Sequence, residues 1–283
     1  MRADGRRAKG LTAIEQAIPH IMPKRVDAQN YVTEYVDEEV IKEYIRRVRR
    51  EKGVRLTRMS VVIAAYYLAS LQHPYINRFV VNSRVYNRNH FCVSFVMLKK
   101  RADGTPDETT VKIFMTPEDD IFSINQRIND TIEKNSEPKH NNNTDKFASF
   151  MFSLPILPYL VMAIVRLLDR CGLLPRALID LSPFHTSVFI TNLASINTSY
   201  IYHHCYEFGT TSVFLCMGKP VPDPLVPGKR RMPLGVVMDE RIATGIEYSR
   251  FFAAFGRYLR DPACLERRLD GGGEAVQEEK MTV

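Results

Sequence analysis

The stretch "VVMDERIATGIEYSRFF", residues 236–252, places the strongest constraint on what this chain can fold into. An apolar run comes first, Asp-Glu-Arg follows, and a glycine then leads into a segment whose aromatic side chains recur at helical spacing. This order predicts a buried strand, a turn and a helix. The turn has the outline of an active site, but it contains no histidine, cysteine or nucleophilic serine placed for chemistry.

Composition and charge limit the classes of protein that fit. The chain has 283 residues, of which 45% are hydrophobic, enough for one large domain. Much of its formal charge of +7 is concentrated in the start "MRADGRRAKG" and in residues 42–58. Such a basic cluster either invites a phosphate-bearing partner, such as a nucleotide, coenzyme A or nucleic acid, or is a solvated helix face.

Cysteine spacing and the N-terminus indicate a compartment. The five cysteines include no C-x-x-C pair, so we expect neither a disulfide framework nor a metal site. No apolar core of a signal peptide precedes Glu15. We therefore expect a reducing, cytoplasmic setting.

One uncharged segment, "FASFMFSLPILPYLVMAIV" at residues 147–165, approaches the length of a membrane-spanning helix. Pro155 and Pro158 near its centre, and the amphipathic stretch that follows, argue against a span. Peripheral membrane contact through residues 147–168 is an alternative. The interpretation we favour is an apolar helical insertion at residues 147–182, forming a buried or subunit-facing hairpin.

Caps and periodicity predict most of the other elements. We expect helices from Asp37 to Gly53, after Thr57, from Thr116-Pro117-Glu118, and up to Asp261-Pro262. We expect two strands within residues 76–98, joined by a polar turn at 87–89, and further strands at "TTVKIFM", "TSVFITNL", "TSVFLCMGK" and "MPLGVVMDE". Because these elements do not alternate strictly, they predict an α+β domain whose mixed sheet is covered by helices.

The same pass along the chain predicts its domain organisation. We expect a basic N-terminal arm at residues 1–14, one catalytic-type domain at 15–265 and a polar, disordered tail at 266–283. Within the domain, the polar tract at 134–146 is predicted to be a flexible loop.

Four stretches carry a resemblance to a known enzyme family. They are "LASLQHPYINRFVVNSRVYNRNHFCVSFVM", "SVFITNLASI", "TTSVFLCMGKPV" and "VVMDERIATGIEYSRFFAAFGRYLRDP". The second is similar to an F-T-I-S-N-L-G strand, and the last is similar to a D-H-R-x-x-D-G turn with its helix and closing D-P. In this order they resemble the catalytic domain of the dihydrolipoyl acyltransferases of 2-oxoacid dehydrogenase complexes and, more distantly, chloramphenicol acetyltransferase. The resemblance covers residues 15–262.

This resemblance implies a fold, a reaction and an assembly. The fold would be the two-layer α+β sandwich of chloramphenicol acetyltransferase. The reaction would transfer an acyl group between coenzyme A and a thiol, hydroxyl or amine acceptor, in a homotrimer whose active sites lie between subunits. No lipoyl or peripheral-subunit-binding domain is present, so we expect no lipoyl group on this chain, and no nucleic-acid partner is expected. The polar tail favours an isolated trimer.

Residue by residue, the family turn is only partly retained. Asp239, Arg241 and Gly245 match the motif, but Glu240 stands at the histidine position and Thr244 at the aspartate position. The resemblance therefore implies weakened catalysis, because both positions of the proton chemistry have changed. Glu240 can act as a base if burial raises its pKa. The alternative is an ion pair that holds the turn.

Three further residues are candidates for the site. Thr191 stands where the family strand has serine, so its hydroxyl is a candidate oxyanion donor, although threonine is also ordinary in strands. His203 and His204 precede the strand "TSVFLCMGK", and neighbours in an extended chain point to opposite faces. One of them is either a replacement base or a structural histidine.

Two hypotheses of different classes follow. The first is a coenzyme A-dependent acyltransferase with Glu240, His203 or His204 as base and Thr191 at the oxyanion. The second is a non-catalytic trimeric binding or assembly protein that keeps the fold. A channel onto these side chains favours the first, and an arginine bound to Glu240 favours the second.

Overall fold

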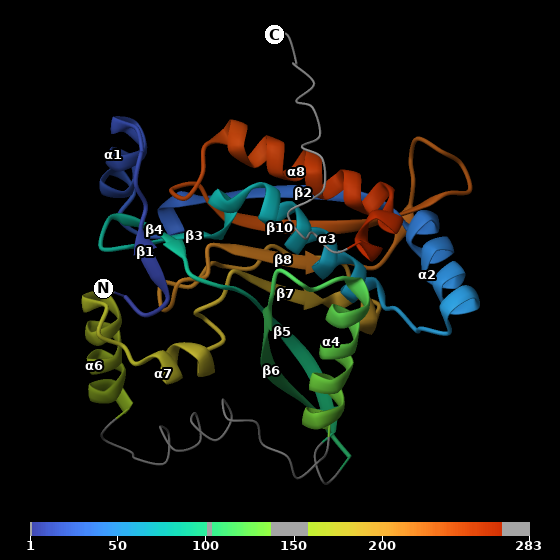
Figure 1. Cartoon of the computed structure of the whole chain (residues 1–283), viewed down its shortest axis with the longest axis horizontal. Coiled ribbons are helices and arrows are strands. Elements are labelled where there is room, and N and C mark those ends of the chain that lie inside the picture. Colours follow the sequence, from blue (N-terminus) through green and yellow to red (C-terminus); the bar gives the residue numbers. More distant parts are fainter. Residues whose placement is uncertain (1, 101–103, 137–157, 268–283) are drawn as a thin grey trace.

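The computed structural model describes residues 2–100, 104–136 and 158–267, which form two sheets and a layer of helices (Figure 1). The large sheet runs in the order β2 (Gln29–Asp37), β10 (Arg230–Asp239), β8 (Val213–Met217), β7 (Val188–Asn192), β5 (Phe91–Lys100) and β6 (Pro106–Met115), with β9 (Val221–Pro222) beside β10. The small sheet runs in the order β1 (Gly5–Arg7), β4 (Arg84–Arg88) and β3 (Arg78–Val81).

The large sheet is mixed. β7 pairs in parallel with β5 on one side and with β8 on the other, whereas the β2–β10, β10–β8 and β5–β6 pairs are antiparallel. The central strand β8 is buried along its whole length, and its sequence "VFLCM" is apolar throughout. This agrees with the rule that parallel strands are covered on both faces.

Helices cover one face of the large sheet. They are α2 (Glu38–Lys52), α3 (Arg58–Gln72), α4 (Ile121–Ser136) and α8 (Gly245–Arg260), and their apolar side chains form one core with alternate residues of the strands. α3 is apolar nearly all round and is buried from Met59 to Ser70, as its sequence predicts. α2 begins at Asp37, whose carboxylate accepts the Glu39 amide at 2.9 Å, and ends at Gly53 with φ +70°.

The other face of the sheet is covered by chain without regular secondary structure. Phe189, Phe214 and Val237 project from β7, β8 and β10 into a small cluster of their own with Cys205. The segment at residues 198–209 supplies this cover, since Tyr200 lies against Gly235 and His203 stacks on Phe214. This face therefore has a thin cover that leaves polar side chains near the strands.

The remaining elements lie at the periphery. They are α1 (Ala13–Ile21), α6 (Pro158–Cys171), α7 (Arg176–Leu181) and the short 3₁₀ turns η1 (Val26–Ala28), η2 (Pro74–Asn77), η3 (Leu193–Ile196) and η4 (Pro262–Glu266). Figure 1 shows α6 and α7 at the lower left, close to the N-terminus and away from the main helix layer. None of the helices in the described part of the chain has both the length and the apolar character needed to cross a bilayer.

The predicted fold class is confirmed, and two local predictions are wrong. Residues 78–100 form three strands, because the chain turns at Asn82 and Ser83, both with positive φ, while 87–88 belong to β4. Helix α4 begins at Ile121 rather than at Thr116, since the Asp120 carboxylate accepts the amides of Phe122 and Ser123. The edge strand β2 has no counterpart among the predicted elements.

The structure adds detail to the predicted domain organisation. In the predicted basic N-terminal arm, Gly5–Arg7 pairs with β4, and Arg2 is buried against Asp169 of α6. The loop predicted at 134–146 is helical up to Ser136, and its other residues lie outside the described part. In the predicted helical insertion, the described residues contain α6 and α7. Glu266 of the predicted tail is ordered by Arg47 and Lys52, and 268–283 are outside the described residues.

Candidate functional site

The turn after β10 is built around Asp239, which is completely buried. Arg241 binds both of its carboxylate oxygens, with Nε 2.8 Å from Oδ1 and Nη2 2.7 Å from Oδ2. Arg25 adds a second cation, its Nε lying 3.6 Å from Oδ2. The motif aspartate and arginine therefore form a buried ion pair that shapes the turn.

Arg241 also ties the turn to the N-terminal part of the chain. Its Nη1 donates to the carbonyls of Met22 and Pro23 at 3.0 and 3.1 Å, and Tyr248 Oη donates to the Asp239 carbonyl at 2.8 Å. Burial alone would lower the pKa of Arg241, but the hydrogen bond and charge of Asp239 raise it overall. These contacts give both matching motif residues a structural role.

Thr244 is the N-cap of α8. Its hydroxyl accepts the Glu247 amide at 3.3 Å, and the Glu247 carboxylate accepts the Thr244 amide at 2.7 Å. This reciprocal capping box explains why a threonine fits at the aspartate position of the motif. Gly245 is the first residue of the helix and has open space around it.

Glu240 is held by backbone and amide contacts. Its amide donates to the Ala28 carbonyl at 2.9 Å, and its Oε2 accepts from Asn30 Nδ2 at 2.6 Å. No arginine or lysine in the described ranges forms an ion pair with it. The adjoining cavity of about 20 Å³ has room for about one water molecule. The cavity that Glu240 lines within one chain is therefore too small for a substrate.

Thr191 and His203 meet on the thinly covered face of the sheet. Thr191 Oγ1 lies 3.1 Å from His203 Nε2, and the imidazole stacks on Phe214 with ring centroids 4.3 Å apart. Burial, and then the charge of His204, lowers the pKa of His203. The imidazole is therefore neutral at pH 7 and can accept a proton. This hydroxyl–imidazole pair is the one contact that the structure makes between predicted site residues of different segments.

His204 and the turn lie apart from this pair. His204 is exposed and has no hydrogen bond or ion pair within the part of the chain that the structure describes. Thr191 is opposite Cys216 in β8, which is opposite Gly235 in β10, whereas Asp239 lies four residues beyond Gly235. At about 3.3 Å per residue this is roughly 13 Å along the strand, in addition to two strand spacings. One chain cannot bring Glu240 to Thr191.

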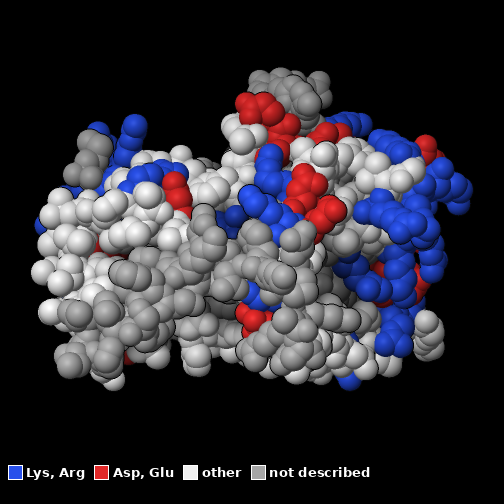
Figure 2. All heavy atoms as spheres, turned by 90° about the horizontal axis from the view of Figure 1, so that it is seen from below, with Lys and Arg blue, Asp and Glu red and all other residues white. Residues whose placement is uncertain are grey.

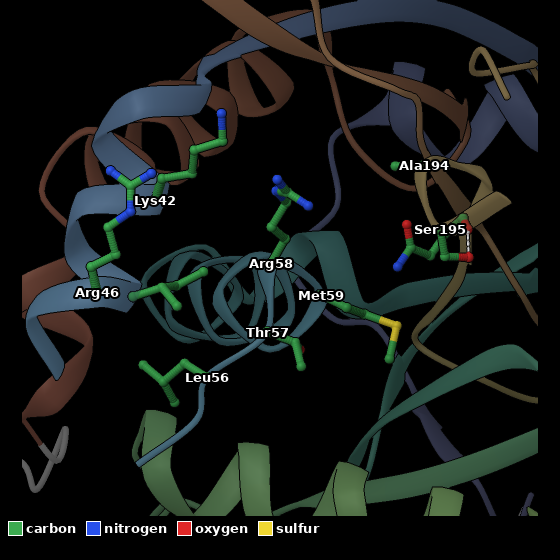
Figure 3. A pocket seen from close by; sticks show the side chains of 10 residues that line it. Lys42, Arg46, Leu56, Thr57, Arg58, Met59, Ala194 and Ser195 are labelled. Atoms are coloured by element: carbon green, nitrogen blue, oxygen red, sulfur yellow. Dashed lines mark hydrogen bonds between the residues drawn. The ribbon is translucent and has the colours of Figure 1, made fainter. Parts of the chain in front are cut away.

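A basic pocket beside the end of β7 was not predicted as a unit. It has a volume of about 410 Å³ and is lined by Lys42, Ile45, Arg46, Leu56, Thr57, Arg58, Met59, Asn192, Ala194 and Ser195. Figure 3 shows the lysine and arginines of α2 and α3 on one side and the η3 residues Ala194 and Ser195 on the other. The signal in the sequence was the basic run at residues 42–58, which gave no indication of what lay opposite.

Several polar groups of this pocket lack partners. Arg46 forms no ion pair in the described part of the chain, while Arg58 and Lys42 share Glu38. Arg58 Nε and Asn192 Oδ1 are buried and make no hydrogen bond to any residue that the structure describes. Arg58 Nε is a donor and Asn192 Oδ1 an acceptor, so it is the unpartnered guanidinium nitrogen and the cationic wall that favour an anionic ligand. No cluster of described side chains is suited to hold a metal ion.

Comparison with known proteins shows the fold. No family model matches the sequence, and no curated protein matches it. Among solved structures, the cubic core of a pyruvate dehydrogenase multienzyme complex is 13% identical, covers 89% of this chain and 88% of its own, and has a TM-score of 0.57.

Two further structures agree. The dihydrolipoamide acetyltransferase of Azotobacter vinelandii is 13% identical over 88% of this chain and 90% of its own, with a TM-score of 0.56. A chloramphenicol acetyltransferase is 11% identical over 90% of this chain and 99% of its own, also with a TM-score of 0.56. The chain therefore has the chloramphenicol acetyltransferase-like fold that the four sequence stretches predict.

Proposed function

We propose that this chain, with its chloramphenicol acetyltransferase-like fold, transfers an acyl group between coenzyme A and a thiol, hydroxyl or amine acceptor, with His203 as the base. The observation that carries the proposal is the 3.1 Å contact between Thr191 Oγ1 and His203 Nε2. A neutral imidazole within hydrogen-bond reach of a hydroxyl is the arrangement that proton transfer requires. The solved A. vinelandii enzyme supports it by analogy, since a serine, a histidine and an asparagine have been investigated in its mechanism.

The two side chains have separate roles in this reaction. In the tautomer that carries its proton on Nδ1, Nε2 has a lone pair, and the Thr191 hydroxyl donates to it in the free protein. An acceptor that takes the place of this hydroxyl gives its proton to Nε2 as it attacks the thioester carbonyl. Thr191 is then free to donate its hydrogen to the oxyanion of the tetrahedral intermediate. The intermediate collapses, the coenzyme A sulfur leaves, and the imidazolium returns the proton to it.

The basic pocket is the proposed site for the coenzyme A phosphates. Lys42, Arg46 and Arg58 supply cations, and Asn192, which lines the pocket, directly follows Thr191 in β7. An anionic ligand would satisfy the unpartnered Arg58 Nε. The proposal therefore explains two features of the sequence. The basic run binds the phosphates, and the turn can lack the motif histidine because His203 carries out the proton transfer.

Mass spectrometry of acyl transfer from acetyl-CoA to a panel of thiols, alcohols and amines tests the proposal. We expect His203→Gln and Thr191→Val each to lower kcat by about 10²-fold or more, because each removes a group acting in the transition state. His204→Gln is the matched control, since it changes an exposed neighbour, and Glu240→Gln should also leave the rate near that of the unaltered protein. Equal rates for His203→Gln and His204→Gln would exclude His203 as the base.

Calorimetry with coenzyme A tests the binding half separately. We expect Arg46→Gln to weaken binding about tenfold, since a charged hydrogen bond to phosphate contributes about 1.5–3 kcal/mol. Arg50→Gln on the same helix, outside the pocket, is the control. A lack of binding by the unaltered protein would support the second candidate function, a non-catalytic trimeric binding or assembly protein. The closed, structurally bonded turn at Asp239 and Glu240 is the observation that favours this candidate.

A further inference from the structure

Helix α6 exposes a row of large apolar side chains. Among its 14 residues the only buried one is Asp169, and the inward side also carries half-buried apolar residues, namely Val161, Met162, Val165 and Leu168. The exposed fractions are 88% for Tyr159, 56% for Leu160, 47% for Ile164 and 61% for Leu167. A surface helix of a water-soluble domain normally has polar side chains on its outward face. The exposed apolar residues of α6 therefore need an explanation.

Specific polar contacts fix this orientation. Arg2 Nη2 lies 2.6 Å from Asp169 Oδ1, and His185 Nε2 lies 3.4 Å from Oδ2. Asn82, in the β3–β4 turn, donates to the Arg170 carbonyl at 2.7 Å. Burial would raise the pKa of Asp169, but the hydrogen bond and charge of His185, followed by Arg2, lower it overall, so the carboxylate is ionised. Rotating the helix to bury Leu160 and Leu167 would break this buried ion pair.

The exposed apolar residues form one stripe with a basic border. Leu160, Ile164 and Leu167 follow helical spacing, and Leu173 continues the stripe beyond the helix. Arg166 and Arg170 are exposed along one side and have no ion-pair partner among the described residues. In Figure 2 the left end of the molecule, where Figure 1 places α6, is mostly uncharged, in contrast to the basic end at the right.

A second copy of this chain is a poor occupant for the stripe. A helix of 14 residues is about 21 Å long and 10 Å wide, a footprint of roughly 200 Å², against about 800 Å² per partner in a stable interface. Two such faces would also bring Arg166 and Arg170 of both copies together. An anionic bilayer meets neither objection, because it accepts apolar side chains over any area and its headgroups attract arginine.

We propose that α6 is a membrane-surface contact, which lies in the boundary between headgroups and acyl chains of an anionic bilayer. Leu160, Ile164 and Leu167 insert among the acyl chains. Arg166 and Arg170 extend to the lipid phosphates, and Tyr159 lies at the interface, where its polar tip stays hydrated. The buried contacts of Asp169 hold the apolar stripe outward in the absence of lipid. This proposal is independent of the acyl-transfer proposal and does not involve the basic pocket.

Two exposed cysteines allow a direct test. Cys171 ends α6, whereas Cys264 lies in η4, and the other three cysteines are buried. The full chain with Cys264→Ser carries an environment-sensitive dye on Cys171, and the chain with Cys171→Ser carries it on Cys264. On vesicles of phosphatidylcholine mixed with phosphatidylglycerol, we expect a blue shift of emission for the Cys171 dye only. Equal shifts at both positions, or none at Cys171, would overturn the proposal.

Flotation with the same vesicles tests the named side chains. We expect the triple variant Leu160→Gln, Ile164→Gln, Leu167→Gln to bind at least about tenfold more weakly, since each buried methylene contributes to membrane affinity. The matched control is Ile14→Gln, Ile21→Gln, Leu225→Gln, which removes three exposed apolar side chains elsewhere. Arg166→Gln with Arg170→Gln should lower binding to anionic vesicles and abolish the preference over pure phosphatidylcholine vesicles.

Each other occupant predicts a different result. If a second copy covered α6, the triple variant would change the mass in light scattering and leave flotation unchanged. If residues 147–157 of the same chain covered it, the dye on Cys171 would be shifted before vesicles are added, and the unaltered protein would not float. Either result overturns the proposal. All variants change exposed positions, so circular dichroism and unfolding curves should match those of the unaltered chain.

Discussion

At the scale of the residue, the turn after β10 keeps the outline of the motif, while the proton transfer that we propose takes place at His203. Asp239 and Arg241 are buried and bonded to each other, and they close the turn against the N-terminal part of the chain. Replacing Asp239 or Arg241 would remove a buried charge and reshape the turn. Glu240, in contrast, is partly exposed, and its carboxylate accepts one hydrogen bond from the side-chain amide of Asn30. The residues that match the motif are the structural ones.

Asp239→Asn should therefore destabilise the protein strongly. Removing the charge leaves Arg25 and Arg241 buried without the carboxylate that binds them, which costs about 3–5 kcal/mol. Glu240→Gln, the neighbouring control, should change the free energy of unfolding by less than about 1 kcal/mol. Urea denaturation measures both. A loss below about 1 kcal/mol for Asp239→Asn would mean that water reaches the arginines.

His90 should make stability fall at acidic pH. Burial, followed by the charges of Arg88, Arg176 and Lys112, lowers the pKa of His90 to about 3, and neither ring nitrogen has a hydrogen-bond partner in the described chain. Because the unfolded pKa is about 6.5, the unfolded state binds a proton between pH 6.5 and 3 that the folded state does not. Stability contributed by the neutral ring is complete above pH 6.5 and is lost as pH falls.

Denaturation of the unaltered chain and of His90→Gln at pH 7.5 and pH 4.5 checks this prediction. With a discount for the exposed part of the ring, the unaltered chain should lose about 1–2 kcal/mol more than the variant between the two pH values. Other titrating groups are common to both proteins and cancel. Parallel pH profiles would show that His90 takes up its proton in the folded state.

At the scale of the element, short-range chemistry decides where strands and helices begin and end. The β3–β4 hairpin has a loop of two residues, since Val81 pairs with Arg84, and Asn82 and Ser83 have φ of +49° and +53°. These values are those of a type I′ turn, which favours Asn-Gly. Because the pair here is Asn-Ser, the sequence pattern did not indicate a turn at these residues, and two strands were predicted where three exist.

Ser83→Gly should stabilise the hairpin by about 0.5–1 kcal/mol, because glycine adopts positive φ without the strain that a Cβ causes. Gly53→Ala is the reverse control: with φ +70° and no atom within 4 Å of the added Cβ, it should destabilise through conformation alone. In thermal unfolding, the midpoint should rise for Ser83→Gly and fall for Gly53→Ala. A lower midpoint for Ser83→Gly would show that the serine side chain contributes a contact outweighing the strain.

Variants of Thr244 distinguish a role in capping α8 from a role in catalysis. Thr244→Ala removes the cap of α8 and should cost about 1 kcal/mol, while Thr244→Ser should retain most of the stability. If the role is only capping, acyl transfer by the folded Thr244→Ala variant should match that of the unaltered chain. A large fall in kcat with unchanged stability would instead give Thr244 a part in catalysis.

At the scale of the whole molecule, the separation of Glu240 from the Thr191–His203 pair bears on assembly. Glu240 follows β10, whereas Thr191 lies in β7, two strands away in the sheet and displaced along the strand direction. A site that used both would need a second copy of the chain. A homotrimer with sites between subunits, as the sequence resemblance implies, would supply one.

Light scattering should therefore give the mass of three chains. If Glu240 contributes across the interface, co-assembled Glu240→Gln and His203→Gln chains should recover part of the activity that His203→Gln chains lack, because some sites then contain neither substitution. If Glu240 is only structural, Glu240→Gln trimers alone should be fully active. An active monomer would exclude the trimeric arrangement altogether.

The sequence by itself determined the features that depend on neighbours along the chain. Asp37, Thr57 and Gly53 predicted helix ends, the apolar runs predicted the buried strands, and four ordered stretches predicted the fold. Such signals are local because a cap or an amphipathic period acts within a few residues. The same reasoning missed β2 and the binding of Arg2 to Asp169, which depend on partners far along the chain.

Only the tertiary structure decided which residues meet. The sequence offered Glu240, His203 and His204 as candidates for the base, and only the packing of residues 198–209 over β7 brings His203 to Thr191. It also decided which side of α6 is exposed: Leu160, Ile164 and Leu167 lie outward, because the buried ion pair between Asp169 and Arg2 holds the opposite side of the helix inward. Both outcomes depend on contacts between distant segments, whose geometry no local pattern encodes.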